Sequence, residues 1–450
     1  MNREVDEQAQ YQELNENENI LPKNYSNLRS QSTLRGQKQQ NAYSRLTETS
    51  SVWHLVIFSA AIVTIVLAEQ LYREPLFNLT LRVVPDVQKD ISDFALYYFK
   101  FMTLFGYGHF AVGVFVLFFT FSTREKAFYL LLVHTVAGIL NQELKIIYHN
   151  PRPYIMSPDV QALACSKSFG NPSGHSSLSA CYFVTLFLVI YHDTPFKSHR
   201  EQKHFSYYLA LIGVIFMVIN VPMSRVVLGV HGLNQILYGM TYGLWLALFM
   251  FQYVRPAVYR HVKKLLEFNN PSYYRTFGVM VEPANIDHMN YAFKCLGIYA
   301  GIVIFSTLNY YIVRSNFEYP QEWLDAIILK CNEGKPLEIK GIFADSAFVK
   351  TGLVSIIFGA YLGMLYDSFY MGGTPSTIND TSSLKGILRL LIGGLVIIPF
   401  TLPYLLIGSS LSVGLLYFIK SALPFFMVGF IMFSWLKSVY IVAEVINTNT

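Results

Sequence analysis

Long apolar runs recur along this 450-residue chain, with short polar segments between them. A helix of about 20 apolar residues crosses a hydrocarbon core of ~30 Å, so each long run predicts a membrane-spanning helix. The pattern therefore predicts an all-α polytopic membrane protein with about ten transmembrane helices. These spans are 52–72, 108–122, 127–147, 176–192, 207–223, 232–252, 292–313, 349–367, 385–407 and 414–440, the last of which is interrupted by Lys420 and Pro424.

The first 51 residues lack this pattern. They are rich in Asn, Gln, Glu and Ser, so we expect residues 1–51 to form a disordered tail. Only 14% of the whole chain is charged, compared with about 25% in soluble domains, which again favours a lipid environment. The chain is thus divided into the tail, a membrane core at 52–260 and a C-terminal extension at 261–450 with about four helices.

Positive charge predicts the orientation in the membrane. The second half of the tail carries several Lys and Arg residues and no acid between Lys23 and Arg45, and basic juxtamembrane segments mark the cytoplasmic side. A cytoplasmic tail places the basic loops on its own side and the acidic loop 314–348 on the other. We therefore expect an integral membrane protein with a cytoplasmic N-terminus. The endoplasmic reticulum is its expected location, although the charge pattern does not decide the organelle. The basic loops are 123–126, 193–206 and 253–291.

Two features of the opposite, non-cytoplasmic side stay open at the level of sequence. Asn78-Leu79-Thr80 is a glycosylation sequon, which is either used or too close to the membrane. Cys165 and Cys331 also fall on this side, where a disulfide between them would survive. They are expected either as that disulfide or as two unpaired thiols.

Three polar clusters stand at the ends of predicted spans, and the charge-based topology places all of them on the non-cytoplasmic face. They are KIIYHNPRPY from Lys145 to Tyr154, FGNPSGHS from Phe169 to Ser176, and SRVVLGVH from Ser224 to His231. Cations and histidines dominate these clusters, so they are the candidate chemistry of the chain.

The three clusters contain more cations than nearby acidic residues could neutralise. Lys145, Arg152 and Arg225 are costly near a membrane boundary unless they meet an anion, and the arginine fork suits phosphate oxygens. Glu143 is expected to form a structural ion pair with Lys145 or Arg225. Pro172-Ser173-Gly174-His175 is typical of a helix start, which also favours an anion.

Two histidines beside a phosphate site indicate phosphoryl transfer through a covalent phosphohistidine. One histidine attacks phosphorus and the other protonates the leaving oxygen. These loops contain no carboxylate cluster for Mg²⁺, so we expect a metal-independent reaction without a cofactor, in which the cations stabilise the transition state.

The pattern Lys-x6-Arg-Pro, Pro-Ser-Gly-His and Ser-Arg-x5-His resembles the type 2 phosphatidic acid phosphatase (PAP2) superfamily over about residues 100–252. The resemblance implies a six-helix PAP2-type core within 52–260. It also implies His175 as the general acid and His231 as the nucleophile. The phosphate-binding residues that it implies are Lys145, Arg152, Ser173, Gly174 and Arg225.

Gln235 departs from the pattern of many superfamily members, which have Asp at this position. It follows His231 by four residues and so shares its helix face. We expect Gln235 to orient the far ring nitrogen of His231 without accepting a proton.

The substrate stays open between branches of the superfamily. The polar tail, the short interval between Arg152 and Pro172 and the four late spans resemble sphingosine-1-phosphate phosphatases. The Gly174 motif, Cys165 and Gln235 look more like glucose-6-phosphatase. We expect hydrolysis of a lipid phosphate, either a sphingoid-base phosphate or phosphatidate, drawn from the membrane lipids at the lumenal face.

Two alternatives to a lipid phosphatase stay open. The first is a sugar phosphate hydrolase, and the second is a transporter with an inactive phosphatase site. We expect no nucleic-acid partner, and the sequence does not specify an oligomeric state.

Overall fold

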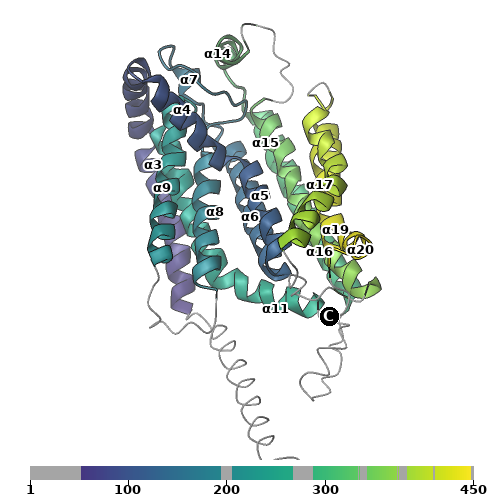
Figure 1. Ribbon diagram of the computed structural model, residues 1–450. Helices are drawn as coiled ribbons and strands as arrows, with labels where there is room; N and C mark the ends of the chain where they lie inside the picture. The colour runs from purple at the N-terminus through teal and green to yellow at the C-terminus, as the bar shows by residue number, and fades with distance from the viewer. Residues whose placement is uncertain are drawn as a thin grey trace, which may run out of the picture. The chain divides into compact units, whose positions relative to one another are not determined.

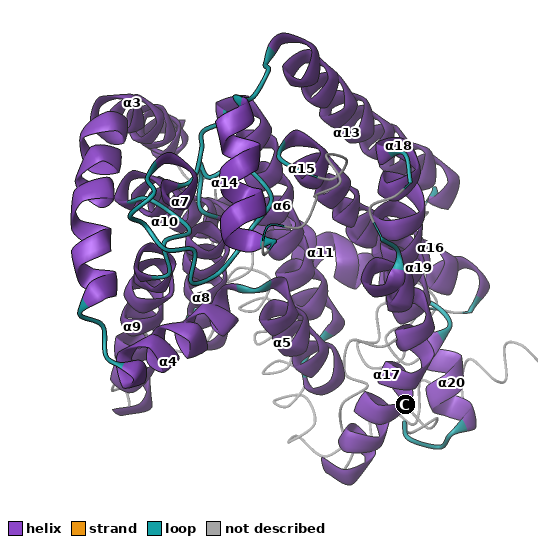
Figure 2. Ribbon diagram, turned by 90° about the horizontal axis from the view of Figure 1, so that it is seen from above, coloured by secondary structure: helices purple, strands orange, loops and turns teal. Residues whose placement is uncertain are grey.

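The computed structural model of the protein describes residues 52–193, 205–266, 287–332, 334, 342–371, 373, 383–408 and 411–446. The expected disordered tail at 1–51 lies outside the described residues. Throughout the described part, every regular element is a helix (Figures 1 and 2), as the apolar pattern predicts.

The first half of the described chain contains the helices that carry the three polar clusters. They are α3 (Val52–Lys89), α4 (Asp93–Met102), the 3-10 turn η2 (Thr103–Gly106), α5 (Gly108–Phe121), α6 (Arg124–Tyr148), α7 (Pro153–Met156), α8 (Gly174–Tyr191), α9 (Phe205–Val227), α10 (Leu233–Phe249), the π-helical turn η3 (Met250–Val254) and α11 (Arg255–Leu266).

The second half forms the C-terminal extension. Its elements are α13 (His288–Asn316), α14 (Gln321–Cys331), α15 (Ala344–Thr351), the 3-10 turn η4 (Gly352–Val354), α16 (Ser355–Tyr370), α17 (Ser383–Leu406), α18 (Val413–Leu415), the π-helical turn η5 (Leu416–Ala422), α19 (Leu423–Phe433) and α20 (Leu436–Val442).

Each predicted span coincides with a helix, but not every one of these helices is long and apolar enough by itself to cross a membrane. Within the described ranges, 8 helical segments are long and apolar enough to cross a membrane, and the bent pair 93–106 and 110–121 makes up to 9. The predicted span 232–252 corresponds to α10, which has only 17 residues and continues through η3. The chain is an integral membrane protein.

The two outermost predicted spans have different bounds from those expected. Helix α3 continues past residue 72 to Lys89, through Pro75 and Pro85, because its later polar residues contact the loops of the site. The last predicted span, 414–440, ends at Phe433, and its interrupting Lys420 lies in η5 and donates to the carbonyl of Ile407 at 2.6 Å.

The structure describes the sequon and the pair of cysteines, Cys165 and Cys331. Thr80 of the sequon is buried in α3 and donates to the carbonyl of Leu76 at 2.7 Å, so its hydroxyl is not presented at the surface. Cys165 and Cys331 form a disulfide, which decides between the two expectations for these thiols.

Close packing of α8 against α10 sets the position of the site. Helix α8 contacts α6, α9 and α10. A Cβ at Gly239 would lie 2.6 Å from the carbonyl oxygen of Ser173, and one at Gly243 would lie 2.5 Å from that of Ser177. Small residues thus let the two helices approach closely, which brings together the two loops that carry histidines.

Candidate active site

The three polar clusters meet in the structure. Arg152 Nη1, from the segment after α6, lies 2.9 Å from His231 Nε2, in the turn between α9 and α10. The N–H of Ser173, at the start of α8, donates to the carbonyl of Gln235 at 3.0 Å. One site therefore combines residues from all three clusters.

Lys145 lies in the last turn of α6 and is only 4% exposed. Its Nζ donates to the carbonyl of Phe169 at 2.8 Å. Helix α6 ends immediately afterwards, at His149 in the left-handed conformation, whose N–H donates to the carbonyl of Lys145. Lys145 therefore faces the segment before α8 and does not extend towards the lipid headgroups.

Arg152 is held mainly by main-chain carbonyls. Its Nε donates to Ser168 O at 2.7 Å, its Nη2 to Phe169 O at 3.0 Å and its Nη1 to Val230 O at 3.0 Å. The side chain is 1% exposed. These carbonyls compensate partly for lost hydration without cancelling the charge, so the guanidinium is fixed in place and still cationic.

Gln235 fixes the tautomer of His231. Its Nε2 donates to Pro151 O at 2.8 Å, so its Oε1 faces His231 Nδ1 at 3.0 Å. Because an amide oxygen only accepts and a guanidinium only donates, Nδ1 carries the proton and Nε2 accepts from Arg152. The neutral imidazole thus has its Nε2 lone pair inside the site, as a nucleophile requires.

Burial and the neighbouring positive charge keep this imidazole neutral. His231 is 2% exposed. Burial, followed by the charges of Arg152, Lys145 and Arg225, holds the pKa of His231 well below its ordinary range, although the hydrogen bond that Nδ1–H donates to Gln235 acts in the opposite direction. The neutral form of His231 is therefore favoured in the site.

His175 lies in the first turn of α8, which Ser173 caps through its Oγ and the N–H of Ser176 at 3.4 Å. The His175 ring makes an edge-to-face contact with Tyr107 at 4.6 Å. Its Nε2 has no hydrogen-bond partner in the part of the chain that the structure describes. Gly174 is the first residue of the helix, whose N-terminus favours an anion.

Arg225 lies in the last turn of α9 and is 2% exposed. Its Nη1 donates to Thr103 Oγ1 at 2.6 Å, and its side chain also hydrogen-bonds to Tyr107. The segment around η2 thus contacts both Arg225 and His175. The sequence pattern did not identify Thr103 or Tyr107, which belong to none of the motifs.

Gly229 shapes the turn that carries His231. It has a φ of 73°, and a Cβ there would lie 2.2 Å from Gln161 O, so only glycine fits. The turn folds back onto Arg225, whose carbonyl accepts from the N–H groups of Val230 and His231.

Positive charge in the site is not neutralised by carboxylates. Among the salt bridges of the described residues, none involves Lys145, Arg152 or Arg225. Both His175 and His231 experience the electrostatic field of all three cations. Buried cations without a counter-ion are unfavourable, so the site is built for an anion.

The expected ion pair of Glu143 is wrong. Glu143 accepts instead from Ser306 Oγ at 2.5 Å and from Asn309 Nδ2 at 2.6 Å, both on α13. Residues two apart on a helix do not share a face, so Glu143 points away from Lys145 and towards the extension.

Polar residues of α3 support the loops of the site. Glu69 is 0% exposed and accepts from Asn171 Nδ2 at 2.8 Å, directly before the Pro172 motif. Gln88 donates to Gln161 O at 3.0 Å and to Val227 O at 2.9 Å. Glu69 is a carboxylate within an apolar run. Because intramembrane charges are costly, this position could have indicated a functional or supporting role from the sequence.

The extension contributes a further cation, Lys350 on α15. Helix α15 packs against α6. The half-buried Lys350 interacts electrostatically with Lys145, Arg152 and His175. Lys350 stands inside a predicted apolar span, which could have indicated a functional cation, but it belongs to none of the three motifs.

Known proteins resemble this chain over the region of the site. Residues 126–259, which include every site residue predicted from the sequence, match the family model described as PAP2 superfamily. A stretch of 117 residues, 26% of this chain, is 34% identical to phosphatidylglycerophosphatase B of Bacillus subtilis (strain 168) and spans about half, 52%, of that relative.

One solved structure is also similar. It is that of a transmembrane PAP2-type phosphatidylglycerolphosphate phosphatase from Bacillus subtilis, which is 22% identical to this chain. The match covers 42% of this chain and 92% of the other, with a TM-score of 0.36.

The uncompensated cations predict stabilisation by a tetrahedral anion. Orthophosphate at about 100 times its Kd should stabilise the purified protein by about 2.7 kcal/mol and raise its Tm by a few degrees. Lys145→Met should weaken this response. Differential scanning fluorimetry checks this result, with chloride at matched ionic strength as the control. An equal shift with chloride would contradict a built anion site.

Proposed function

Residues 126–259 form a PAP2 superfamily domain, and from this premise we propose that the protein is a membrane-embedded, metal-independent phosphomonoesterase acting on a lipid phosphate. The observation that carries the proposal is the convergence of two histidines and three buried cations, none of them neutralised by a carboxylate among the described residues. We assign 52–260 as the catalytic core and 261–450 as the extension.

In the proposed first step, His231 Nε2 attacks phosphorus while the bond from phosphorus to the leaving oxygen breaks. Arg152 now donates to this nitrogen, and its N–H moves to a phosphate oxygen when substrate binds. Lys145, Arg225 and the N–H groups at the start of α8 stabilise the remaining oxygens. Nδ1–H of His231 stays hydrogen-bonded to Gln235, which supports the phosphohistidine without adding negative charge.

His175 serves as the general acid and then as the general base. The phosphate dianion offsets the neighbouring cations, so the imidazole can hold the proton that it gives to the leaving oxygen. Water then attacks the phosphohistidine, His175 takes up its proton, and the bond from phosphorus to His231 breaks to release orthophosphate. The partnerless Nε2 of His175 supports this role.

The charge of the site favours an anionic lipid. The relative from Bacillus subtilis is named a phosphatidylglycerophosphatase, which supports a lipid phosphate. Lys350 adds a further cation, which would repel the ammonium group beside the phosphate of a sphingoid base. We therefore rank phosphatidate above sphingoid-base phosphate and glucose 6-phosphate.

We propose that the site faces the lumen of the endoplasmic reticulum and that the N-terminus is cytoplasmic. The disulfide joins Cys165, in the segment that follows Arg152, to Cys331 at the end of α14, and disulfides persist on the oxidising side of this membrane. The basic loops of the sequence support the same orientation.

Removal of the nucleophile should be far more damaging than removal of its orienting residue. His231→Ala should abolish turnover and any labelled phosphoenzyme, whereas Gln235→Ala should lower kcat about tenfold, roughly the value of one hydrogen bond. Rapid-quench trapping of ³²P-labelled protein measures both. Normal turnover in His231→Ala, or equal losses in the two variants, would be inconsistent with these roles.

Loss of the general acid should depend on the leaving group. His175→Ala should slow hydrolysis of an alkyl phosphate by about 10²–10⁴-fold and that of an aryl phosphate much less, because an aryl oxide leaves without protonation. Parallel kcat measurements on the two substrates test this. Equal losses would remove His175 from the general-acid role.

A substrate panel tests the ranking. Phosphatidate should give a higher kcat/KM than sphingoid-base phosphate or glucose 6-phosphate, with EDTA leaving all rates unchanged. Lys350→Met should lower the preference for phosphatidate over the sphingoid-base phosphate several-fold, and Lys350→Arg, which keeps the charge, should preserve it. A preference for glucose 6-phosphate would replace the lipid assignment, and a strict Mg²⁺ requirement would overturn the mechanism.

A further inference from the structure

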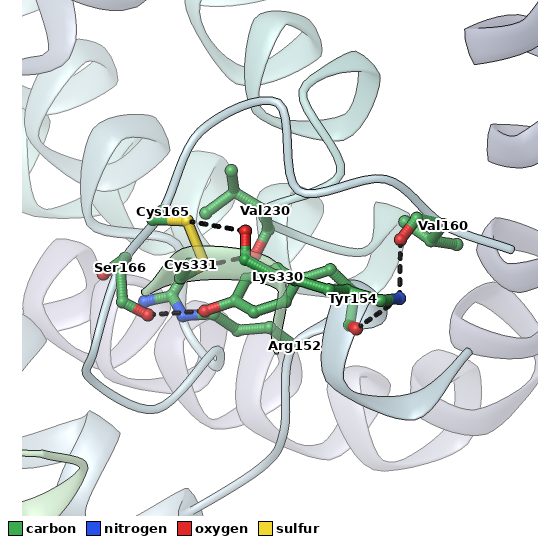
Figure 3. Close-up of a disulfide and its surroundings, with 8 residues drawn as sticks. All are labelled: Arg152, Tyr154, Val160, Cys165, Ser166, Val230, Lys330 and Cys331. Atoms are coloured by element: carbon green, nitrogen blue, oxygen red, sulfur yellow. Dashed lines mark hydrogen bonds between the residues drawn. A yellow bond between two sulfur atoms is a disulfide. The ribbon is translucent and has the colours of Figure 1, made fainter. Parts of the chain in front are cut away.

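Helix α14 of the extension is attached to the segment that holds Arg152 through two consecutive residues. Lys330 Nζ donates to the carbonyls of Tyr154, Ser157 and Val160 at 3.0, 2.7 and 2.9 Å. It also lies 3.2 Å from the carbonyl of Pro158. The next residue, Cys331, is bonded to Cys165. Figure 3 shows the disulfide at Cys165 and, apart from it, the Lys330 amine against Tyr154 and Val160.

Lys330 compensates for the end of a very short helix. Helix α7 has only four residues, Pro153–Met156, so its last carbonyls lack partners within the helix. The Lys330 ammonium donates to one of them, that of Tyr154, and to carbonyls that follow the helix, and a cation is favoured at the negative end of a helix. The other cationic side chains of the site are the ones we propose to contact phosphate, whereas Lys330 is half-exposed and bound to carbonyls, which is the geometry of a positioning residue.

A continuous series of contacts leads from this attachment to the nucleophile. Tyr154, whose carbonyl binds Lys330, donates its hydroxyl to Ser166 O at 2.7 Å. Two residues later, Ser168 O accepts from Arg152 Nε at 2.7 Å. Arg152 in turn contacts His231 Nε2 at 2.9 Å. A shift of the segment would thus move the guanidinium that fixes the imidazole.

The extension contacts this segment at a second point. The N–H of Phe343, just before α15, donates to Lys167 O at 2.6 Å. Its ring stacks on that of Phe169 at 5.1 Å, and the carbonyl of Phe169 accepts from Lys145. Cys331 and Phe343, which precede and follow the residues 335–341 that the structure does not describe, therefore both support the segment from Cys165 to Phe169.

We propose that α14 is a clamp that preorganises the phosphate site, with Lys330 as a positioning residue and the pair Cys165–Cys331 as a requirement for full activity. This proposal rests on the proposed phosphatase function. The clamp lies outside the region matched to the PAP2 family, 126–259, so it gives the extension a part in the catalysis of the core. Reduction of the disulfide should loosen the segment and weaken phosphate binding.

The test uses the full-length protein in detergent, with orthovanadate inhibition, kcat and KM as readouts. Lys330→Met, Cys331→Ser and wild type treated with dithiothreitol should each bind orthovanadate about tenfold more weakly, because small displacements of positioned groups are costly. Lys330→Arg should recover most of the affinity. Lys89→Met, at an exposed lysine in the last turn of α3, is the matched control, and dithiothreitol should not affect Cys331→Ser further.

Hydrogen exchange separates failure of the clamp from failure of the proposed function. Peptides covering 154–170 should exchange faster in Lys330→Met and after reduction, while those of α6 and α8 remain protected. Unchanged exchange and unchanged orthovanadate affinity would overturn the clamp even in an active enzyme. Faster exchange in a protein that neither hydrolyses phosphomonoesters nor binds orthovanadate would instead refute the phosphatase function. A loss in Lys330→Met alone that disappears at high salt would indicate long-range electrostatics and would also overturn the clamp.

Discussion

The site depends on the burial of three cations, Lys145, Arg152 and Arg225, without a neutralising carboxylate among the described residues. Main-chain carbonyls and hydroxyls replace part of their hydration, as at Phe169 and Thr103, but leave the net charge in place. An anion with several oxygens resolves this electrostatic imbalance. Burial, reinforced by the same positive charge, keeps His231 neutral, so the cations that require an anion also help to keep the nucleophile ready.

Much of the surrounding structure serves to hold these groups in place. Gln235 joins the turn of His231 to Pro151 and selects the Nδ1–H tautomer. Helix α3 supports the loops through Glu69 and Gln88, and the extension supports the segment after Arg152. The reactive groups thus occupy the ends of long helices and the loops between them, and their precision derives from contacts between residues far apart in the sequence. Such preorganisation is what makes electrostatic stabilisation effective in catalysis.

Local sequence patterns were sufficient for the class of fold and for the residues that meet in the site. Apolar runs locate helices, and the motif residues stand at the ends of those helices, so convergence follows from topology. The partners of these residues were not predictable, because Arg152 is held by carbonyls that every residue possesses. Glu143 was assigned the wrong partner because its donors belong to α13, and the contribution of Lys330 depends on contacts across more than 170 residues that no local pattern encodes.

The central claim is that one phosphate group is bound by all three clusters and attacked by His231. A structure of the protein with orthovanadate tests it most directly. The account predicts vanadium bonded to His231 Nε2, its equatorial oxygens contacting Lys145, Arg152 and Arg225, and an apical oxygen facing His175. Vanadate bonded through His175, or bound away from this site, would contradict the account.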